Sequence, residues 1–332
     1  MCLCGAVGIK LSQGVAEIRL VSYLCTRFGK VRLIKPAYMM KTNIFSGVGT
    51  ALITPFRTDG AVDEQALCRL VDEQAESGVD FLCVLGTTAE TPTLTHAERR
   101  RVVEIIRDGI SGRLPLLIGA GGNDTTAVCE AVKALPDGVD GVLSVVPYYN
   151  KPSQEGLFRH FQAVAGASPV PVVLYNVPGR TGVNMTAETT LRIARECNNV
   201  VAIKEASGDI AQIAAVIEGA PADFCVLSGD DALAVNLIKQ GACGVISVIS
   251  NAYPRFFSRM IHAALSEQWE EVEQCANKLR PFYKPLFADG NPSGIKQLLS
   301  FEGKCENILR LPLVPVGEET AKQLAGLSLY MK

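Results

Sequence analysis

Short apolar runs alternate with segments of helical periodicity from residue 48 onward. The runs are rich in β-branched residues, which is typical of strands buried in a parallel sheet. Eight such strands are predicted, at residues 48–55, 81–86, 115–121, 141–147, 172–177, 200–205, 224–228 and 244–250. Strands that alternate with helices in this way predict an α/β fold in which helices cross over between parallel strands.

The segments between these runs carry signals for the start of amphipathic helices. Thr95 and Glu98 have the spacing of a capping box, Ser153 precedes another apolar stripe, and Asp209 precedes a stripe that begins at Ile210. Eight strand and helix units match a closed (β/α)8 barrel, the TIM barrel, whereas open doubly wound sheets more often stop at about five or six strands. No G-x-G-x-x-G motif follows the first strand, which argues against a dinucleotide-binding sheet.

The chain continues past the eighth strand with more helical segments than a barrel needs. We expect these helices at residues 256–265, 269–279, 295–299 and 318–324. The predicted organisation is therefore a barrel over residues 42–266 and a C-terminal helical appendage over residues 267–332.

The first 41 residues differ in charge from the rest of the chain. They hold seven basic residues and one acidic residue, Glu17, whereas the remaining 291 residues hold 25 basic and 33 acidic side chains. Glu17 and Arg19 interrupt the best candidate for a signal-peptide core, and serine is too rare for a transit peptide. Residues 1–41 are therefore interpreted as a basic N-terminal extension. Because Met39 and Met40 precede the first strand, we expect the natural start there, with residues 1–38 as an upstream segment that has no fold of its own.

The overall composition favours a globular protein that acts on small molecules. The chain is 48% hydrophobic and 20% charged, with a net charge of -2, so no global charge attracts nucleic acid or an anionic membrane. It contains no run of 18 apolar residues that would cross a bilayer.

The eleven cysteines show neither a clear disulfide framework nor a metal-ligand spacing. We interpret them as reduced residues of a cytoplasmic protein, with a disulfide framework as the alternative. Cys2 and Cys4 alone are a weak metal signal.

Lys204 follows four apolar residues within the sixth predicted strand. Active sites of such barrels lie at the carboxyl ends of the strands, so its side chain either enters the barrel mouth or extends to solvent. An unperturbed lysine, with a pKa of about 10.4, is charged at neutral pH. Burial disfavours the ammonium form and frees the lone pair for attack on a carbonyl. Lys204 is therefore a candidate Schiff-base lysine.

Polar side chains follow two other strands at the same expected edge. Tyr175 is a candidate proton shuttle for Lys204 if the fifth and sixth strands are neighbours, or else a core tyrosine. Arg180, on a predicted Pro-Gly turn, suits a carboxylate, although an exposed loop arginine is commoner. Thr87 and Thr88, with adjacent backbone N–H groups, suit a small carboxylate or an ordinary turn.

Six motifs occur together in a fixed order. They are G-T-T-A-E at 86–90, P-Y-Y-N-K-P-S-Q-E-G at 147–156, Y-N-V-P-G-R-T-G at 175–182, I-K-E-A-S-G at 203–208, S-G-D-D at 228–231 and G-V-I-S-V at 244–248. In order and spacing they resemble the dihydrodipicolinate synthases, which belong to the pyruvate-dependent class I aldolases. The resemblance spans about residues 44–328.

The resemblance implies a lyase of lysine (diaminopimelate) biosynthesis. Pyruvate would form an imine with Lys204, tautomerise to an enamine and attack the aldehyde of L-aspartate 4-semialdehyde. Thr87, Tyr175 and Tyr149 would form a proton relay, with Tyr149 reaching across from a neighbouring subunit of a homotetramer built as a dimer of dimers. The imine would supply the electrophilic activation, so the resemblance implies no metal or other cofactor.

Four further residues match substrate-binding positions of this family. Thr88 would hold the pyruvate carboxylate, Gly229 and Ile246 would line its pocket, and Arg180 would take the carboxylate of the semialdehyde. N-acetylneuraminate lyases are similar around the lysine but usually have G-S-T in the first motif and an apolar residue in place of Arg180. A sugar-acid aldolase or a 4-hydroxy-2-oxoglutarate aldolase is the alternative enzyme, and a binding protein without turnover is the alternative outside catalysis.

A feedback site is implied less completely. His96, Asn123 and Tyr148 match residues that bind L-lysine in sensitive relatives, but Arg99 replaces a histidine and Ala127 replaces a common glutamate. Loss of a charged hydrogen bond costs roughly 1.5 to 3 kcal/mol, or about tenfold to a hundredfold in affinity. We therefore expect weak or absent inhibition by L-lysine.

Overall fold

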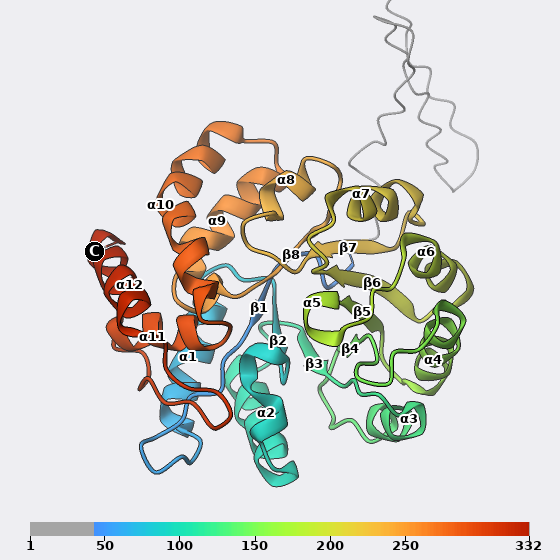
Figure 1. The fold of residues 1–332 in the computed structure, drawn as a ribbon, viewed down its shortest axis with the longest axis horizontal. Coiled ribbons are helices and arrows are strands. Elements are labelled where there is room, and N and C mark those ends of the chain that lie inside the picture. The colour runs from blue at the N-terminus through green and yellow to red at the C-terminus, as the bar shows by residue number, and fades with distance from the viewer. Residues whose placement is uncertain (1–42, 332) are drawn as a thin grey trace, which may run out of the picture. The chain divides into compact units, whose positions relative to one another are not determined.

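The structure is a computed structural model that describes residues 43–331 of the chain (Figure 1). Eight parallel strands close into a barrel in chain order, with the last strand beside the first. The strands are β1 (Gly47–Ala51), β2 (Phe81–Val84), β3 (Leu116–Gly119), β4 (Gly141–Val145), β5 (Val172–Asn176), β6 (Val200–Glu205), β7 (Cys225–Ser228) and β8 (Gly244–Ser247). The predicted (β/α)8 barrel is confirmed, although most strands end before the predicted run does.

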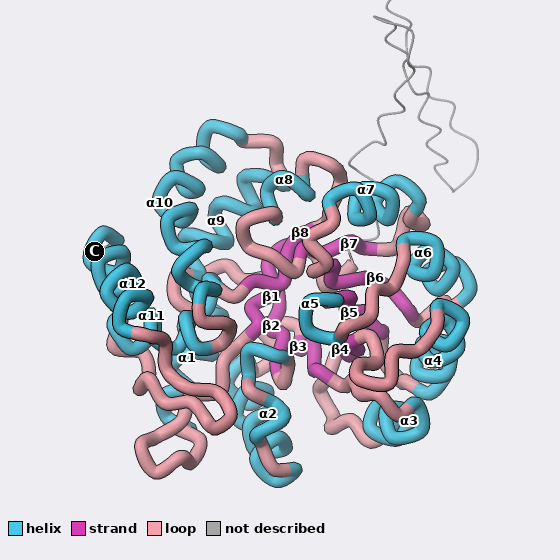
Figure 2. Tube along the Cα trace, viewed as in Figure 1, coloured by secondary structure: helices cyan, strands magenta, loops and turns pink. Residues whose placement is uncertain are grey.

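Helices surround this barrel (Figure 2). They are α1 (Glu64–Glu76), α2 (His96–Ile110), α3 (Thr125–Lys133), α4 (Gln154–Ala167), α6 (Ala187–Glu196), α7 (Ile210–Gly219), α8 (Ala234–Ile238) and α9 (Pro254–Leu265). The expected capping box at the start of α2 is confirmed, because the Glu98 N–H donates to Thr95 Oγ1 at 3.2 Å and Glu98 Oε2 accepts from the Thr95 N–H at 2.9 Å. Ser153 and Asp209 are simple N-caps of α4 and α7, whose side chains accept from the Gly156 and Gln212 N–H groups.

Alternation along the strands divides the buried residues into two sets. In β2, Phe81 and Cys83 belong to the set inside the barrel, whereas Leu82 and Val84 pack in the layer between the strands and the helices. In β6, Ala202 belongs to the inner set, so the period of two directs the side chain two residues later, Lys204, to the same face.

Three helices follow the barrel, as expected: α10 (Trp269–Ala288), α11 (Ser293–Phe301) and α12 (Glu318–Met331). The prediction that α10 ends near residue 279 is wrong, because the helix continues through Pro281 and Pro285. Phe282 and Leu286 are fully buried, so packing outweighs the backbone hydrogen bonds that the two prolines remove. The predicted boundary after residue 266 falls in the short turn between α9 and α10, which pack against each other.

Three further expectations concern the N-terminal extension, the cysteines and membrane-spanning segments. The N-terminal extension, residues 1–41, lies outside the described residues, and so does the Cys2 and Cys4 pair. All eight cysteines in residues 43–331 are free thiols, as expected. Within the same range, no helix has the length and apolarity needed to cross a membrane.

Candidate active site

Lys204 and Tyr175 lie side by side on neighbouring strands inside the barrel. The register of β5 and β6 pairs the two residues directly. Lys204 is 6% exposed, and its Nζ lies 4.5 Å from the centroid of the Tyr175 ring. The side chain therefore stays inside the barrel mouth, and the alternative of a lysine that extends to solvent is wrong. This places an amine and a phenol together in a space with little water, as imine chemistry requires.

The surroundings of Lys204 are closely packed. A Cβ added to Gly229, which follows β7, would lie 3.2 Å from Lys204 Cε and 2.6 Å from Ala206 Cβ, so the lysine stem passes directly beside this glycine. Ile246 of β8 is fully buried in the inner set. Burial raises the pKa of the Cys83 thiol to about 11, against an opposing effect from nearby Lys204. The thiol of Cys83 therefore stays protonated at neutral pH and does not compete with the amine as a nucleophile.

The predicted threonine pair forms a single 3-10 turn after β2, η1 (Thr87–Ala89). The turn closes when the Glu90 N–H donates to the Thr87 carbonyl at 3.2 Å, and Glu90 itself takes a left-handed conformation with φ 54°. Thr88 is buried, and its Oγ1 accepts a hydrogen bond from Asn291 Nδ2 at 2.9 Å. Thr88 thus has a fixed partner on one side of its hydroxyl.

Arg180 lies on a helical turn rather than on the predicted Pro-Gly turn. The segment forms α5 (Pro178–Thr181), in which proline occupies the first helical position, where its missing N–H costs nothing. The Arg180 side chain is exposed, and its Nη2 donates to the Asn291 carbonyl at 3.3 Å. Its guanidinium therefore keeps further donors for an anion that enters from solvent.

A buried carboxylate lies on the opposite face of the same two strands. Asn176 Nδ2 donates to both carboxylate oxygens of Glu205, at 3.1 and 3.2 Å, and Asn176 Oδ1 accepts from the Met185 N–H. Burial raises the pKa of Glu205, while hydrogen bonds from Ser207 and Asn176 lower it. This pair crosslinks β5 to β6 one residue beyond Tyr175 and Lys204, and so supports their register.

Tyr149 is far more exposed than the other candidate catalytic residues. It follows β4 with a positive φ of 71°, and its side chain is 88% exposed. A large aromatic residue in this conformation on the surface is unusual for a monomer. Its placement leaves it available to another protein chain.

Two of the three candidate effector residues are exposed, and Asn123 is half-buried. Tyr148 and His96 are exposed, and the Asn123 carbonyl accepts from Asn150 Nδ2 at 3.0 Å, which links its loop to the segment after β4. The Arg99 guanidinium is held by two hydrogen bonds to nearby backbone groups: Nε donates to the Leu94 carbonyl and Nη2 to the Thr91 carbonyl.

Three residues at this site have no role in the sequence prediction. Asn291 lies between α10 and α11 in an Asp-Gly-Asn-Pro segment, which indicates only a turn. Lys296 of α11 forms an ion pair with Glu90, and neither side chain is exposed. Glu90 belongs to the first motif, but no local signal shows that its partner is a helix about 200 residues away.

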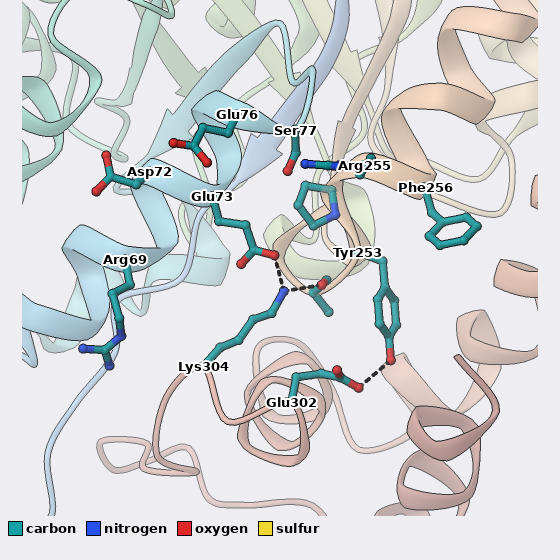
Figure 3. Close-up of a pocket in the computed structure, with 12 residues that line it drawn as sticks. Arg69, Asp72, Glu73, Glu76, Ser77, Tyr253, Arg255, Phe256, Glu302 and Lys304 are labelled. Atoms are coloured by element: carbon teal, nitrogen blue, oxygen red, sulfur yellow. Dashed lines mark hydrogen bonds and ion pairs between the residues drawn. The ribbon is translucent and has the colours of Figure 1, made fainter. Parts of the chain in front are cut away.

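A separate pocket of about 530 Å³ contains none of these residues (Figure 3). It lies between α1, the start of α9 and the segment after α11. Lys304 contacts Glu73 at 2.6 Å across this pocket, and the Tyr253 hydroxyl donates to Glu302 at 2.9 Å. Two pairs of its charged and polar side chains are therefore already bonded to each other.

Comparison with known proteins gives one consistent family. The dihydrodipicolinate synthetase family matches residues 44–328. The 4-hydroxy-tetrahydrodipicolinate synthase of Parabacteroides distasonis is 54% identical over 270 residues, which cover 81% of this chain and 91% of that protein.

Solved structures agree with this match. The crystal structure of dihydrodipicolinate synthase from Thermotoga maritima has a TM-score of 0.84 at 43% identity and covers 87% of this chain and 99% of that one. A structure described as the first monomeric dihydrodipicolinate synthase variant has a TM-score of 0.83 at 43% identity and covers 86% of this chain and 96% of that one.

Proposed function

The chain belongs to the dihydrodipicolinate synthetase family, and on this premise we propose that it catalyses the 4-hydroxy-tetrahydrodipicolinate synthase reaction. In this reaction a lyase condenses pyruvate with L-aspartate 4-semialdehyde in lysine biosynthesis. The observation that carries the proposal is the buried amine of Lys204 against the Tyr175 ring, 4.5 Å from its centroid.

The chemistry begins with a covalent bond between Lys204 and pyruvate. The Lys204 amine adds to the C2 carbonyl, and loss of water gives an imine whose nitrogen accepts electrons from C3. Loss of a C3 proton then gives an enamine, which attacks the aldehyde carbon of the semialdehyde. The amino group of the adduct finally attacks C2, which closes the ring and releases Lys204.

Each of these steps moves a proton, and the Tyr175 ring lies beside the Lys204 amine. We assign Tyr175, Thr87 and Tyr149 to a proton relay, in which Tyr175 serves the carbinolamine oxygen and Thr87 connects it onward. Thr87 opens η1 at the carboxyl end of β2, on the same end of the barrel as Tyr175.

The two substrate carboxylates require separate donors. We assign the pyruvate carboxylate to Thr88 and the backbone of η1, with Gly229 and Ile246 beside the methyl and carbonyl groups. We assign the semialdehyde carboxylate to Arg180, whose fork of donors suits a carboxylate and whose side chain reaches solvent.

The protonated imine acts as the electron sink in this scheme, so no metal ion or organic cofactor takes part. The functional assembly is a homotetramer of two tight dimers, in which the exposed Tyr149 of one subunit completes the relay of another. The enzyme acts in the cytoplasm, where its free cysteines stay reduced. His96, Asn123 and Tyr148 form at most a weak site for L-lysine.

Borohydride trapping tests the proposal. Incubation of the full chain with pyruvate and borohydride reduces the imine, so the intact mass increases and peptide mapping places the adduct on Lys204. Lys204→Ala abolishes the adduct, whereas Lys239→Ala, which removes a lysine of the outer surface, retains it. Absence of an adduct on Lys204 would refute the function.

A substrate comparison separates the synthase from the alternative aldolases. The purified chain is assayed with pyruvate plus aspartate semialdehyde, and separately for cleavage of N-acetylneuraminate and of 4-hydroxy-2-oxoglutarate. Product from the first pair alone supports the synthase, and faster cleavage of either acid would assign the chain to the other class.

A further inference from the structure

Asn291 contacts both residues that the proposed function assigns to substrate carboxylates. It lies in the helical appendage, between α10 and α11, and is 9% exposed. Its side-chain Nδ2 donates to Thr88 Oγ1 at 2.9 Å, and its backbone carbonyl accepts from Arg180 Nη2 at 3.3 Å. One residue outside the barrel therefore joins the pyruvate side of the site to the semialdehyde side.

We propose that Asn291 is a positioning residue that orients the Thr88 hydroxyl toward the pyruvate carboxylate. A threonine hydroxyl has one proton to donate and two lone pairs to accept with. Because Asn291 donates to one lone pair, the Thr88 proton remains free for a ligand acceptor. This inference rests on the proposed function, since it takes the ligand acceptor to be a carboxylate oxygen.

The side chain of Asn291 makes a single hydrogen bond among the described residues. Its Oδ1 is buried and has no hydrogen-bond partner among the described residues. A buried acceptor without a partner destabilises a fold, so this amide is not held by hydrogen bonds at both of its ends. The side-chain amide thus makes one hydrogen bond, and that bond goes to Thr88.

The stability of this region depends on other contacts. Lys296 of α11 ion-pairs with Glu90, directly after η1, and donates to the Ile308 carbonyl at 2.9 Å. The appendage thus holds the threonine turn at two points, through Glu90 and through Thr88. Loss of the Asn291 amide leaves the first point intact, so the fold is expected to persist when orientation is lost.

Because Asn291 makes one side-chain and one backbone contact, substitution of its side chain separates the orientation of Thr88 from packing. Asn291→Ala deletes the bond to Thr88 but keeps the backbone carbonyl that Arg180 contacts. We expect the KM for pyruvate to rise roughly 10- to 100-fold, while kcat and the KM for the semialdehyde change much less. Asn291→Asp has nearly the same shape but cannot donate, so it accepts the Thr88 proton and repels the pyruvate carboxylate. It should raise the KM for pyruvate more than alanine does.

Two controls separate orientation from stability. Asn307 is another asparagine of the appendage with a buried, unpartnered Oδ1, and its Nδ2 donates to Gln297 at 2.7 Å. Asn307→Ala should leave the KM for pyruvate unchanged. In a Thr88→Val background, Asn291→Ala should cause no further change in the KM for pyruvate, because the first substitution removes the hydroxyl that Asn291 orients.

The outcomes are distinguishable from failure of the function itself. If the wild-type chain forms the Lys204 adduct, the proposed function stands. The dependence of adduct formation on pyruvate concentration, compared between the wild type and the Asn291 variants, then tests the role of Asn291. The inference is overturned if Asn291→Ala and Asn307→Ala give the same KM for pyruvate, if Asn291→Asp binds pyruvate as well as wild type, or if Asn291→Ala and Thr88→Val act additively. Wild-type chain that forms no adduct overturns both proposals.

Discussion

Lys296 and Glu90 form an ion pair in which both side chains are completely buried. Lys296 Nζ also lies 4.0 Å from the centroid of the Phe56 ring, and Glu90 Oε2 accepts from the Arg310 N–H at 3.0 Å. Burial lowers the pKa of Lys296, and the carboxylate of Glu90 opposes this change. The pair therefore joins the appendage to the threonine turn through charges that have little access to water.

Removal of one partner should destabilise the fold strongly. Lys296→Met leaves the Glu90 carboxylate buried without its ammonium, and we expect a loss of about 3 to 5 kcal/mol in the free energy of unfolding, measured by urea titration. The double variant Lys296→Met with Glu90→Gln should lose less than the single variant. Arg101→Met is the control, because its ion pair with Glu64 is half exposed and should contribute little. Equal losses for Lys296→Met and Arg101→Met would contradict this prediction.

The Tyr175 hydroxyl should be needed for rate rather than for folding. Tyr175→Phe retains the ring against Lys204 but removes the phenol, so kcat should fall roughly 10²- to 10⁴-fold while the borohydride adduct forms more slowly. Quenched-flow mixing with borohydride measures the rate at which the adduct forms. The matched control is Tyr253→Phe, which removes a half-buried hydroxyl bonded to Glu302, outside the set of residues inside the barrel. An unchanged kcat in Tyr175→Phe would show that Tyr175 takes no part in the relay.

His160 should make stability depend on pH. It is buried in α4, its Nδ1 lies 2.9 Å from Thr125 Oγ1, and burial lowers its pKa from 6.5 to about 4. Between these values the unfolded chain binds a proton more readily than the folded chain. The stability from neutral His160 is thus complete above pH 6.5 and is lost as the pH falls toward 4, by about 3 kcal/mol. In His160→Gln, the urea midpoint of unfolding should change less with pH between 4.5 and 7 than in the wild type. An equal change in the two proteins would argue against a lowered pKa of His160.

L-lysine should inhibit weakly because Ala127 provides no carboxylate for its ammonium groups. We expect half-inhibition only above millimolar concentrations in a steady-state titration. Ala127 is exposed on α3, so Ala127→Glu should fold normally and improve inhibition about tenfold or more. Ala127→Gln, which has the same length without the charge, should improve it less. Half-inhibition of the wild type below millimolar lysine would show that this position does not limit binding.

Local sequence was sufficient to predict the parts of the site that lie within one strand and its loop. The direct pairing of Tyr175 with Lys204 depends on a register shift between Val172 and Val173, which the sequence does not show, but the proximity of Tyr175 to Lys204 could be predicted for neighbouring strands. The contact between Asn291 and Thr88 could not, because 203 positions separate them and only packing of the appendage brings them together. The continuation of α10 through Pro281 has the same origin, since tertiary burial outweighed a local signal.

Tyr149 tests whether the relay is completed between subunits. Tyr149→Phe and Lys204→Ala should each be nearly inactive as pure proteins. If the relay crosses the dimer interface, mixing and reassembling the two variants creates sites that combine Lys204 of one chain with Tyr149 of the partner subunit, and activity should return. A mixture of Tyr149→Phe with the double variant Lys204→Ala and Tyr149→Phe should remain inactive, because neither chain supplies the tyrosine. Size-exclusion chromatography with light scattering confirms mixed assembly. Mixed oligomers without recovered activity, or a fully active wild-type monomer, would show that Tyr149 does not act across subunits.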